Sequence, residues 1–282
     1  MYTLIVSVAS SVAVSILLKL ARRHNLQIDQ AIAVNYVVAS SLCLLIFRPD
    51  PTSLLSPATP WWVLAALGVL LPTIFLAMAG AVHHAGIVLS DAAQRLSLFI
   101  PLIASFVLFG EALSGSKIAG IAVAITALFC LLFRPRTAAG SGEMGKSILF
   151  LLAVWVGYGT IDVLFKQLAK SGAAFSSSLF VTFVLAGILI FAYLFARRTA
   201  WSRRNVVAGV VLGLLNFSNI YFYIRAHQVF PENPTLVFSA MNIGVISLGT
   251  LVGAGAFKEK LSWINALGIV LAITAIVVLI PR

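Results

Sequence analysis

Ten apolar runs follow one another along the chain, separated by short polar breaks. A helix needs roughly 20 apolar residues to cross the hydrocarbon core of a bilayer, and each run is close to that length. The runs predict spans near 2–20, 31–47, 61–82, 89–109, 116–134, 146–168, 175–196, 205–226, 235–257 and 262–280. Because the bilayer core offers no water to peptide groups, we expect each run to form a helix.

The composition supports a membrane protein. Hydrophobic residues make up 61% of the 282 positions and charged residues only 10%, whereas soluble domains carry roughly 25% charged residues. Four tryptophans lie near predicted span ends, where indole rings anchor helices at the membrane surface: Trp61, Trp62, Trp201 and Trp263. We therefore predict an all-α integral membrane protein with ten transmembrane helices and no room for a separate soluble domain.

The chain contains an internal repeat. A shift of 148 positions aligns Glu111–Ala127 with Glu259–Ala275 at nine identities in seventeen columns. Because each copy holds an odd number of spans, the two copies would have opposite orientations in the membrane. We predict a 5+5 inverted-topology repeat, with residues 1–134 and 146–282 as the halves and 135–145 as the linker. Such repeats are typical of alternating-access transporters, whose substrate site lies near the midplane.

Several short motifs resemble those of a known transporter family. They are the Gly110-Glu-x-Leu turn, the matching Glu259-x-Leu-Ser turn, Pro101 within the fourth span, and the Trp155–Lys166 segment. Over essentially its whole length the chain resembles the EamA-type members of the drug/metabolite transporter (DMT) superfamily. It departs from them at Gly249, where the second repeat is expected to carry a proline. The resemblance implies ten helices around a central cavity through which metabolites are moved.

Two pairs of charged residues lie inside predicted spans. Asp91 and Arg95 are four residues apart, as are Asp162 and Lys166, so each pair shares one helical face. A charge at the bilayer midplane costs from about 2.5 to more than 10 kcal/mol, and each pair needs an explanation. Either the partners neutralise each other as part of the packing, or they line a cavity and meet a zwitterionic or anionic substrate, or a proton.

Aromatic and amide side chains recur at helical spacing in spans of both halves. The candidates for substrate binding, besides the four charged residues, are Asn35, Tyr36, Gln94, Trp155, Tyr158, Asn216, Asn219, Tyr223 and Asn242. Interhelical hydrogen bonding alone could explain many of the amides. Their recurrence in several helices of both halves favours a water-filled cavity.

Other intramembrane features have structural interpretations. The motifs Gly209-x-x-x-Gly213 and Gly249-x-x-x-Gly253 predict close packing of helices. Arg225 and His227 lie near the end of the eighth span, and we expect their side chains to reach the membrane surface.

The sequence argues against several classes of function. It has no phosphate-binding glycine-rich loop, no zinc-binding cluster and no nucleophile elbow, so we expect neither an enzyme nor a cofactor or metal. Most of the bases behind the net charge of +11 cluster at span ends, which indicates contact with lipid headgroups and not with nucleic acid.

We expect a secondary transporter, an exporter of small polar or amphipathic metabolites such as amino acids, working by alternating access. One alternative is a proton-coupled exporter of drugs or cations. That chemistry calls for a carboxylate in the first span, where Ser7, Ser10, Ser11 and Ser15 stand instead. The other alternative is a non-transporting, lipid-handling membrane protein.

The expected surroundings follow from these predictions. We expect the protein to lie in a bacterial inner membrane, in contact with its lipid, as a monomer or homodimer. Its partners would be a small-molecule substrate and protons, which would act as the coupling ion. The loops on one side of the membrane would carry 12 Lys and Arg residues, and the side that holds both termini would carry 6. Because Lys and Arg residues are enriched on the cytoplasmic side, this count predicts termini outside the cytoplasm. The family resemblance implies both termini inside, and the sequence leaves the two orientations open.

Overall fold

The computed structural model describes residues 1–23, 26–55, 59–85, 87–132, 144–170, 175–257 and 262–280. These residues form eleven α-helices and one 3-10 helix, with no strand among them. The elements are α1 (Tyr2–Arg23), α2 (Ile28–Phe47), η1 (Pro51–Leu55), α3 (Trp61–Ala85), α4 (Ile87–Leu96), α5 (Phe99–Val107), α6 (Gly115–Leu132), α7 (Met144–Ala169), α8 (Phe175–Ala196), α9 (Arg203–Val229), α10 (Pro234–Phe257) and α11 (Trp263–Leu279).

Six of these helices are long and apolar enough to cross a membrane: α2, α3, α7, α8, α9 and the Pro234–Gly255 part of α10. Four shorter apolar segments accompany them: Tyr2–Leu18, Ala92–Val107, Gly115–Cys130 and Trp263–Leu279. The predictions of an all-α chain and of a multi-pass membrane protein are confirmed. Of the predicted linker, residues 135–143 lie outside the described ranges, and Met144 and Gly145 already belong to α7.

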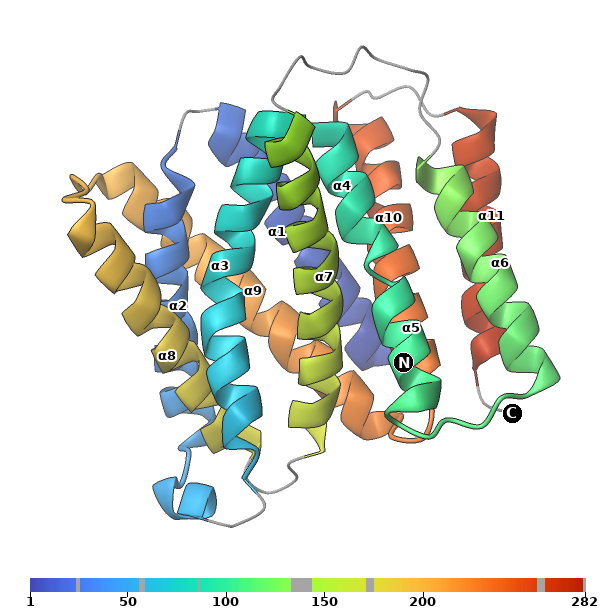
Figure 1. Cartoon of the computed structure of the whole chain (residues 1–282), viewed down its shortest axis with the longest axis horizontal. Coiled ribbons are helices and arrows are strands. Elements are labelled where there is room, and N and C mark those ends of the chain that lie inside the picture. Colours follow the sequence, from blue (N-terminus) through green and yellow to red (C-terminus); the bar gives the residue numbers. More distant parts are fainter. Residues whose placement is uncertain are drawn as a thin grey trace.

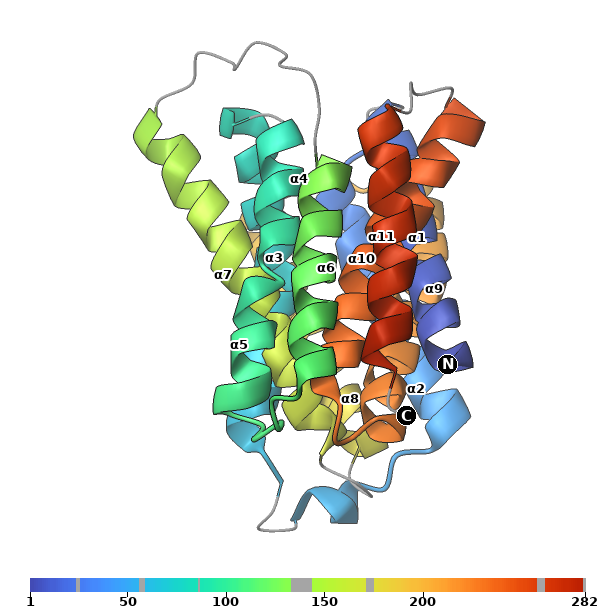
Figure 2. The same cartoon turned by 90° about the vertical axis from the view of Figure 1, so that its right-hand side faces the viewer.

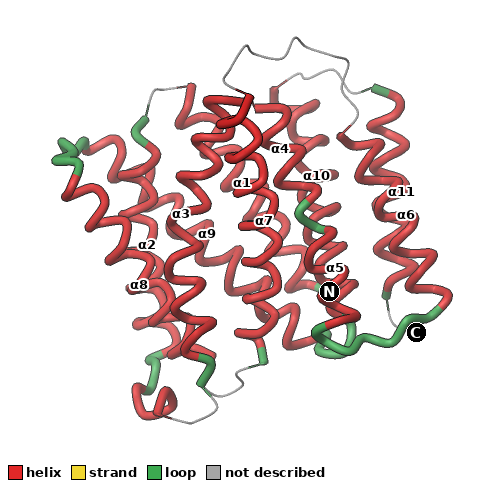
Figure 3. Tube along the Cα trace, viewed as in Figure 1, coloured by secondary structure: helices red, strands yellow, loops and turns green. Residues whose placement is uncertain are grey.

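The helices stand side by side, and their direction alternates along the chain except that α5 continues in the direction of α4 (Figures 1 and 2). Both chain ends lie toward the same end of the bundle, together with η1 and the turns 108–114 and 230–233 (Figures 1 and 3). We call this end the terminal side. Because α7 and α9 both run toward the terminal side, residues four apart on each helix form successive levels along the bundle.

The fourth predicted span is interrupted, and the prediction of one continuous helix over 89–109 was wrong. α4 ends at Leu96 and α5 begins at Phe99, with a turn between them. Pro101 has no N–H to give the Ser97 carbonyl, which accepts instead from the Ile100 amide at 3.0 Å. Since Ile100 no longer pairs four residues back, the Leu96 carbonyl is free to accept a hydrogen bond from another helix.

Glycines allow α9 to pack closely against α2. A Cβ added at Gly209 would lie 2.6 Å from Val34 Cβ, and one at Gly213 would lie 2.6 Å from Val38 Cβ. The prediction of close packing is confirmed for this motif. It was wrong for Gly249, where an added Cβ meets nothing within 4 Å, so α10 makes no close approach to a neighbour there.

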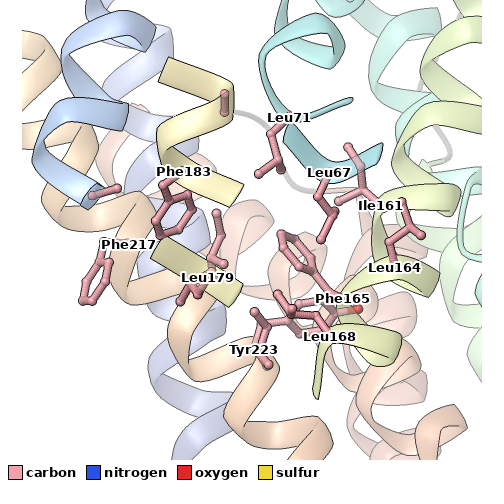
Figure 4. Packing of buried hydrophobic residues seen from close by; sticks show 14 of the residues in the cluster. Leu67, Leu71, Ile161, Leu164, Phe165, Leu168, Leu179, Phe183, Phe217 and Tyr223 are labelled. Atoms are coloured by element: carbon pink, nitrogen blue, oxygen red, sulfur yellow. The ribbon is translucent and has the colours of Figure 1, made fainter. Parts of the chain in front are cut away.

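Buried leucines and aromatic rings fill the space between α3, α7, α8 and α9 (Figure 4). Phe165 of α7 and Tyr223 of α9 meet edge to face, with 6.1 Å between ring centroids. On the other flank, α6 and α11 pack through a second cluster with α10, made largely of alanines and branched aliphatic residues. The bundle therefore has a main core around α7 and α9 and a smaller one at its edge.

Candidate functional site

A cavity of about 150 Å³ lies among helices from both halves of the chain. Its walls come from α1, α2, α3, α4, α7, α9 and α10, together with the turn between α4 and α5. Its lining includes apolar side chains from α3, α9 and α10, namely Leu71, Ile74, Phe75, Ile220 and Val245. Most of the other lining residues are polar, so the cavity is amphipathic.

Nine of the thirteen predicted binding residues line this cavity. They are Tyr36, Gln94, Arg95, Tyr158, Asp162, Asn216, Asn219, Tyr223 and Asn242. Their grouping follows from the bundle, because the polar faces of α4, α7, α9 and α10 turn toward one another. That they bind a substrate stays a prediction.

Asp162 is held at the junction of three helices. The Tyr223 hydroxyl of α9 donates to Asp162 Oδ1 at 2.9 Å, and the Asn242 side chain of α10 also donates to this carboxylate. Asn242 in addition donates to the Phe238 carbonyl at 3.1 Å. The carboxylate is thus fixed in orientation on the cavity wall.

Arg95 places a positive charge in the same cavity. It lies in the last turn of α4, just before the helix break, and shares the cavity wall with Asp162. The Tyr36 hydroxyl is buried and has no hydrogen-bond partner among the described residues. The cavity therefore offers one cationic side chain, one anionic side chain and at least one hydroxyl whose hydrogen-bonding capacity is unused.

The alternative in which Asp162 and Lys166 neutralise each other was wrong. Lys166 Nζ donates to the Pro231 carbonyl at 2.6 Å, while Asp162 takes its hydrogen bonds from α9 and α10. Lys166 is 1% exposed and does not line the cavity. The spacing placed both groups on one face of α7, but the turn after α9 offers Lys166 an acceptor farther along the bundle.

Two other predicted residues serve the packing of helices and do not line the cavity. Trp155 Nε1 donates at 3.0 Å to the Leu96 carbonyl, the group released by the break after α4. Asn35 Oδ1 accepts from Asn216 Nδ2 at 3.1 Å and joins α2 to α9. The side chain of Asp91 lies outside the described part of the structure.

The expectation that His227 reaches the membrane surface was also wrong. Its side chain is buried between the rings of Tyr223 and Phe238, at centroid distances of 5.0 and 4.7 Å. Arg225 is exposed, as expected, and donates to the Gln228 side chain at 2.8 Å. The two residues lie on opposite faces of α9, one toward α10 and one outward.

Three polar or sulfur-containing cavity residues were missed from the sequence: Ser11, Ser97 and Met241. Ser97 owes its position to the helix break, which a regular helical pattern does not predict. Ser11 belongs to a serine stripe on α1, whose Ser7 hydroxyl bonds Asn219 Oδ1 at 3.0 Å. That stripe was a usable signal, since small polar residues at helical spacing often face another helix.

The comparisons with known proteins bear on kinship and fold. An uncharacterized protein of Haemophilus influenzae is 51% identical over 281 residues, covering 98% of this chain and 96% of the relative. The chain belongs to the same family as this protein. A crystal structure of another protein matches at a TM-score of 0.73 and 15% identity, over 98% of this chain and 94% of that one, which shows a shared fold. No family model matches the sequence.

Proposed function

We propose that this protein is a secondary transporter of small zwitterionic or amphipathic metabolites, such as amino acids. The observation that carries the proposal is that Arg95 and Asp162 line the same cavity inside a bundle of apolar helices. Ionisable groups in such surroundings are costly and mark substrate or ion pathways. The guanidinium suits a carboxylate, the aspartate suits an ammonium group, and the apolar lining residues suit a hydrocarbon side chain.

The size of the cavity supports a metabolite over a drug. Pockets for drug-sized ligands measure roughly 300–1,000 Å³, whereas this cavity measures about 150 Å³. The polar lining residues also supply several amide and phenol groups, which fix the orientation of a small polar solute.

An inverted repeat, as in EamA-type transporters, gives the bundle its mechanism. The helix contacts support this repeat. When each helix is exchanged for its counterpart in the other half, the same contacts are obtained. α9 packs on α1 and α2, and its counterpart α3 packs on α7 and α8. Two similar halves around one cavity can rock against each other and expose it alternately to the two sides. The family of the Haemophilus relative supports a place in a bacterial inner membrane.

Purified protein in liposomes tests the proposal. We expect uptake of at least one radiolabelled amino acid from a broad panel. Arg95→Gln should raise the KM at least tenfold, because it removes the partner of the substrate carboxylate, whereas Arg225→Gln on the exposed face of α9 should not.

Asp162→Asn keeps the acceptor for Tyr223 and should abolish the response of transport to an imposed pH gradient, while Asp29→Asn should preserve that response. The absence of flux for every solute in the panel would refute the proposal and leave a lipid-handling role.

A further inference from the structure

α7 and α9 meet at two successive levels. Asp162 and Tyr223 form the first level, at the wall of the cavity. Lys166 and His227 lie four residues further along the same two helices, toward the terminal side. Both are 1% exposed, and neither lines the cavity. The second level is therefore a sealed layer between the cavity and the terminal side.

His227 has unused hydrogen-bonding capacity in this layer. Neither ring nitrogen has a hydrogen-bond partner among the described residues, and the ring is packed between Tyr223 and Phe238. Lys166 of α7 lies at the same level as His227, since each is four residues beyond one partner of the hydrogen bond between Asp162 and Tyr223. α10 contributes Phe238, which does not titrate. The other charges near this layer, Lys170, Glu111 and Glu232, act on Lys166.

Hydrogen bonds next to the same layer hold the start of α10 in place. Lys166 Nζ donates to the Pro231 carbonyl in the exposed turn before α10, at 2.6 Å. Glu111 Oε2 accepts from the Thr235 amide at 3.0 Å and from its hydroxyl at 2.6 Å, and Glu111 Oε1 lies 3.0 Å from Lys117 Nζ. We call Lys166, His227, Phe238 and Pro231 the terminal-side seal.

We propose that His227 is a proton-binding site that opens the terminal-side seal when it becomes charged, so that protons control access to the cavity; this rests on the proposed transport function. A hydronium ion transfers a proton to the lone pair of the unprotonated ring nitrogen, so that one O–H bond breaks, one N–H bond forms and a water molecule is released. The resulting imidazolium lies beside the Lys166 ammonium among aromatic rings. Two like charges in such a layer repel each other and lack solvation, and both costs fall when the helices part and water enters.

The combination of a buried histidine with a lysine at the same level occurs at the terminal side of the bundle. A shift of 147 positions pairs Lys166 with Lys19 of α1, and the shift of 148 pairs His227 with Ala79 of α3. The lysine is thus present in both halves and the histidine in one. Protonation of His227 should therefore act on the terminal side.

Thiol labelling tests the proposal without any substrate. In a protein carrying Cys43→Ala and Cys130→Ala, Ser11→Cys reports access to the cavity and Ser114→Cys, in the exposed turn after α5, serves as its control. A membrane-impermeant methanethiosulfonate is added outside sealed proteoliposomes at about pH 8 and about pH 5, the range in which histidine titrates. The Ser114→Cys signal gives the fraction of molecules with the terminal side outward and corrects for the pH dependence of the reagent.

We expect the corrected labelling of Ser11→Cys to rise several-fold at the lower pH. His227→Phe keeps a ring between Tyr223 and Phe238 and should abolish the rise, and His227→Tyr is the second variant should that protein not fold. Lys166→Met removes the neighbouring charge and should remove most of the rise. Labelling that is independent of pH in the unsubstituted seal, or a rise that persists in His227→Phe and His227→Tyr, would overturn the proposal. Because no flux is measured, neither result depends on which solute is transported.

Discussion

At the scale of single residues, Trp155 shows how a side chain far away in sequence can supply the hydrogen bond that a helix break leaves unmade. The interruption between α4 and α5 leaves the Leu96 carbonyl without its helical partner, and the indole N–H of α7 replaces it at 3.0 Å. Gly159, one turn further along α7, permits the approach, since an added Cβ would lie 3.0 Å from the Ser97 carbonyl. The break and the α7 surface that covers it therefore form one structural unit.

Trp155→Phe should destabilise the protein by about 1–3 kcal/mol, because the buried Leu96 carbonyl would lose its partner while the aromatic packing is largely kept. The measurement is reversible unfolding in mixed micelles. Trp201→Phe is the control, since Trp201 is half-exposed and stacks on Phe191 at 5.8 Å, a contact that phenylalanine retains. Equal losses of stability in the two variants would contradict the role given to the indole N–H.

Nine of the thirteen candidate residues line one cavity, and the others that the structure describes depart from it for identifiable reasons. Helical spacing shows which side chains share a face, so the polar faces of α7 and α9 could be found. It does not show which neighbouring group each side chain meets, and Lys166 reached the Pro231 carbonyl beyond the cavity. His227 was assigned to the membrane surface because it is near a helix end, but α10 covers that end.

At the scale of helices, α2 and α9 are joined through glycine. Gly213→Ala should destabilise the protein by about 1–3 kcal/mol, because the new methyl group would lie 2.6 Å from Val38 Cβ and 3.1 Å from the Asn35 carbonyl. The matched control is Gly249→Ala on α10, where an added Cβ meets open space. There the substitution should be neutral or stabilising by up to about 1 kcal/mol, since alanine favours the helix. A thermal unfolding series in detergent compares the two, and equal shifts in Tm would contradict this account.

The helix positions themselves were largely predictable. Apolar runs of membrane-spanning length located the long helices, and the observed ends differ from the predicted ones by a few residues. The break between α4 and α5 was not predictable from apolarity, because α4 is amphipathic and α5 almost uniformly apolar, a change that a continuous helix can also show. Pro101 marked the region, yet only the hydrogen bonds of Ser97 and Leu96 show where the turn lies.

At the scale of the whole molecule, the two ends of the bundle differ in charge. α1 begins and α11 ends toward one end (Figure 1), and among the described residues the helix ends of the opposite side carry more of the Lys and Arg residues, including Arg22, Arg23, Lys146, Arg203 and Arg204. The positive-inside rule then predicts that the opposite end faces the cytoplasm and that the termini lie outside. Alkaline phosphatase fused at the C-terminal end should be active in intact cells, and green fluorescent protein at the same position should be dark. The reverse pattern would contradict this orientation.

The polar face of α9 has a consequence for the synthesis of the protein. α9 has the lowest mean hydropathy of the six long helices, 1.6, since it carries Asn216 and Asn219 within its apolar stretch. These side chains face partners on α1 and α2, which leave the ribosome before α9. By the time α9 emerges, its hydrogen-bonding partners are already in the bilayer. The order of the helices along the chain thus lets α1 and α2 bind α9, the long helix whose sequence is least favourable for entering lipid alone.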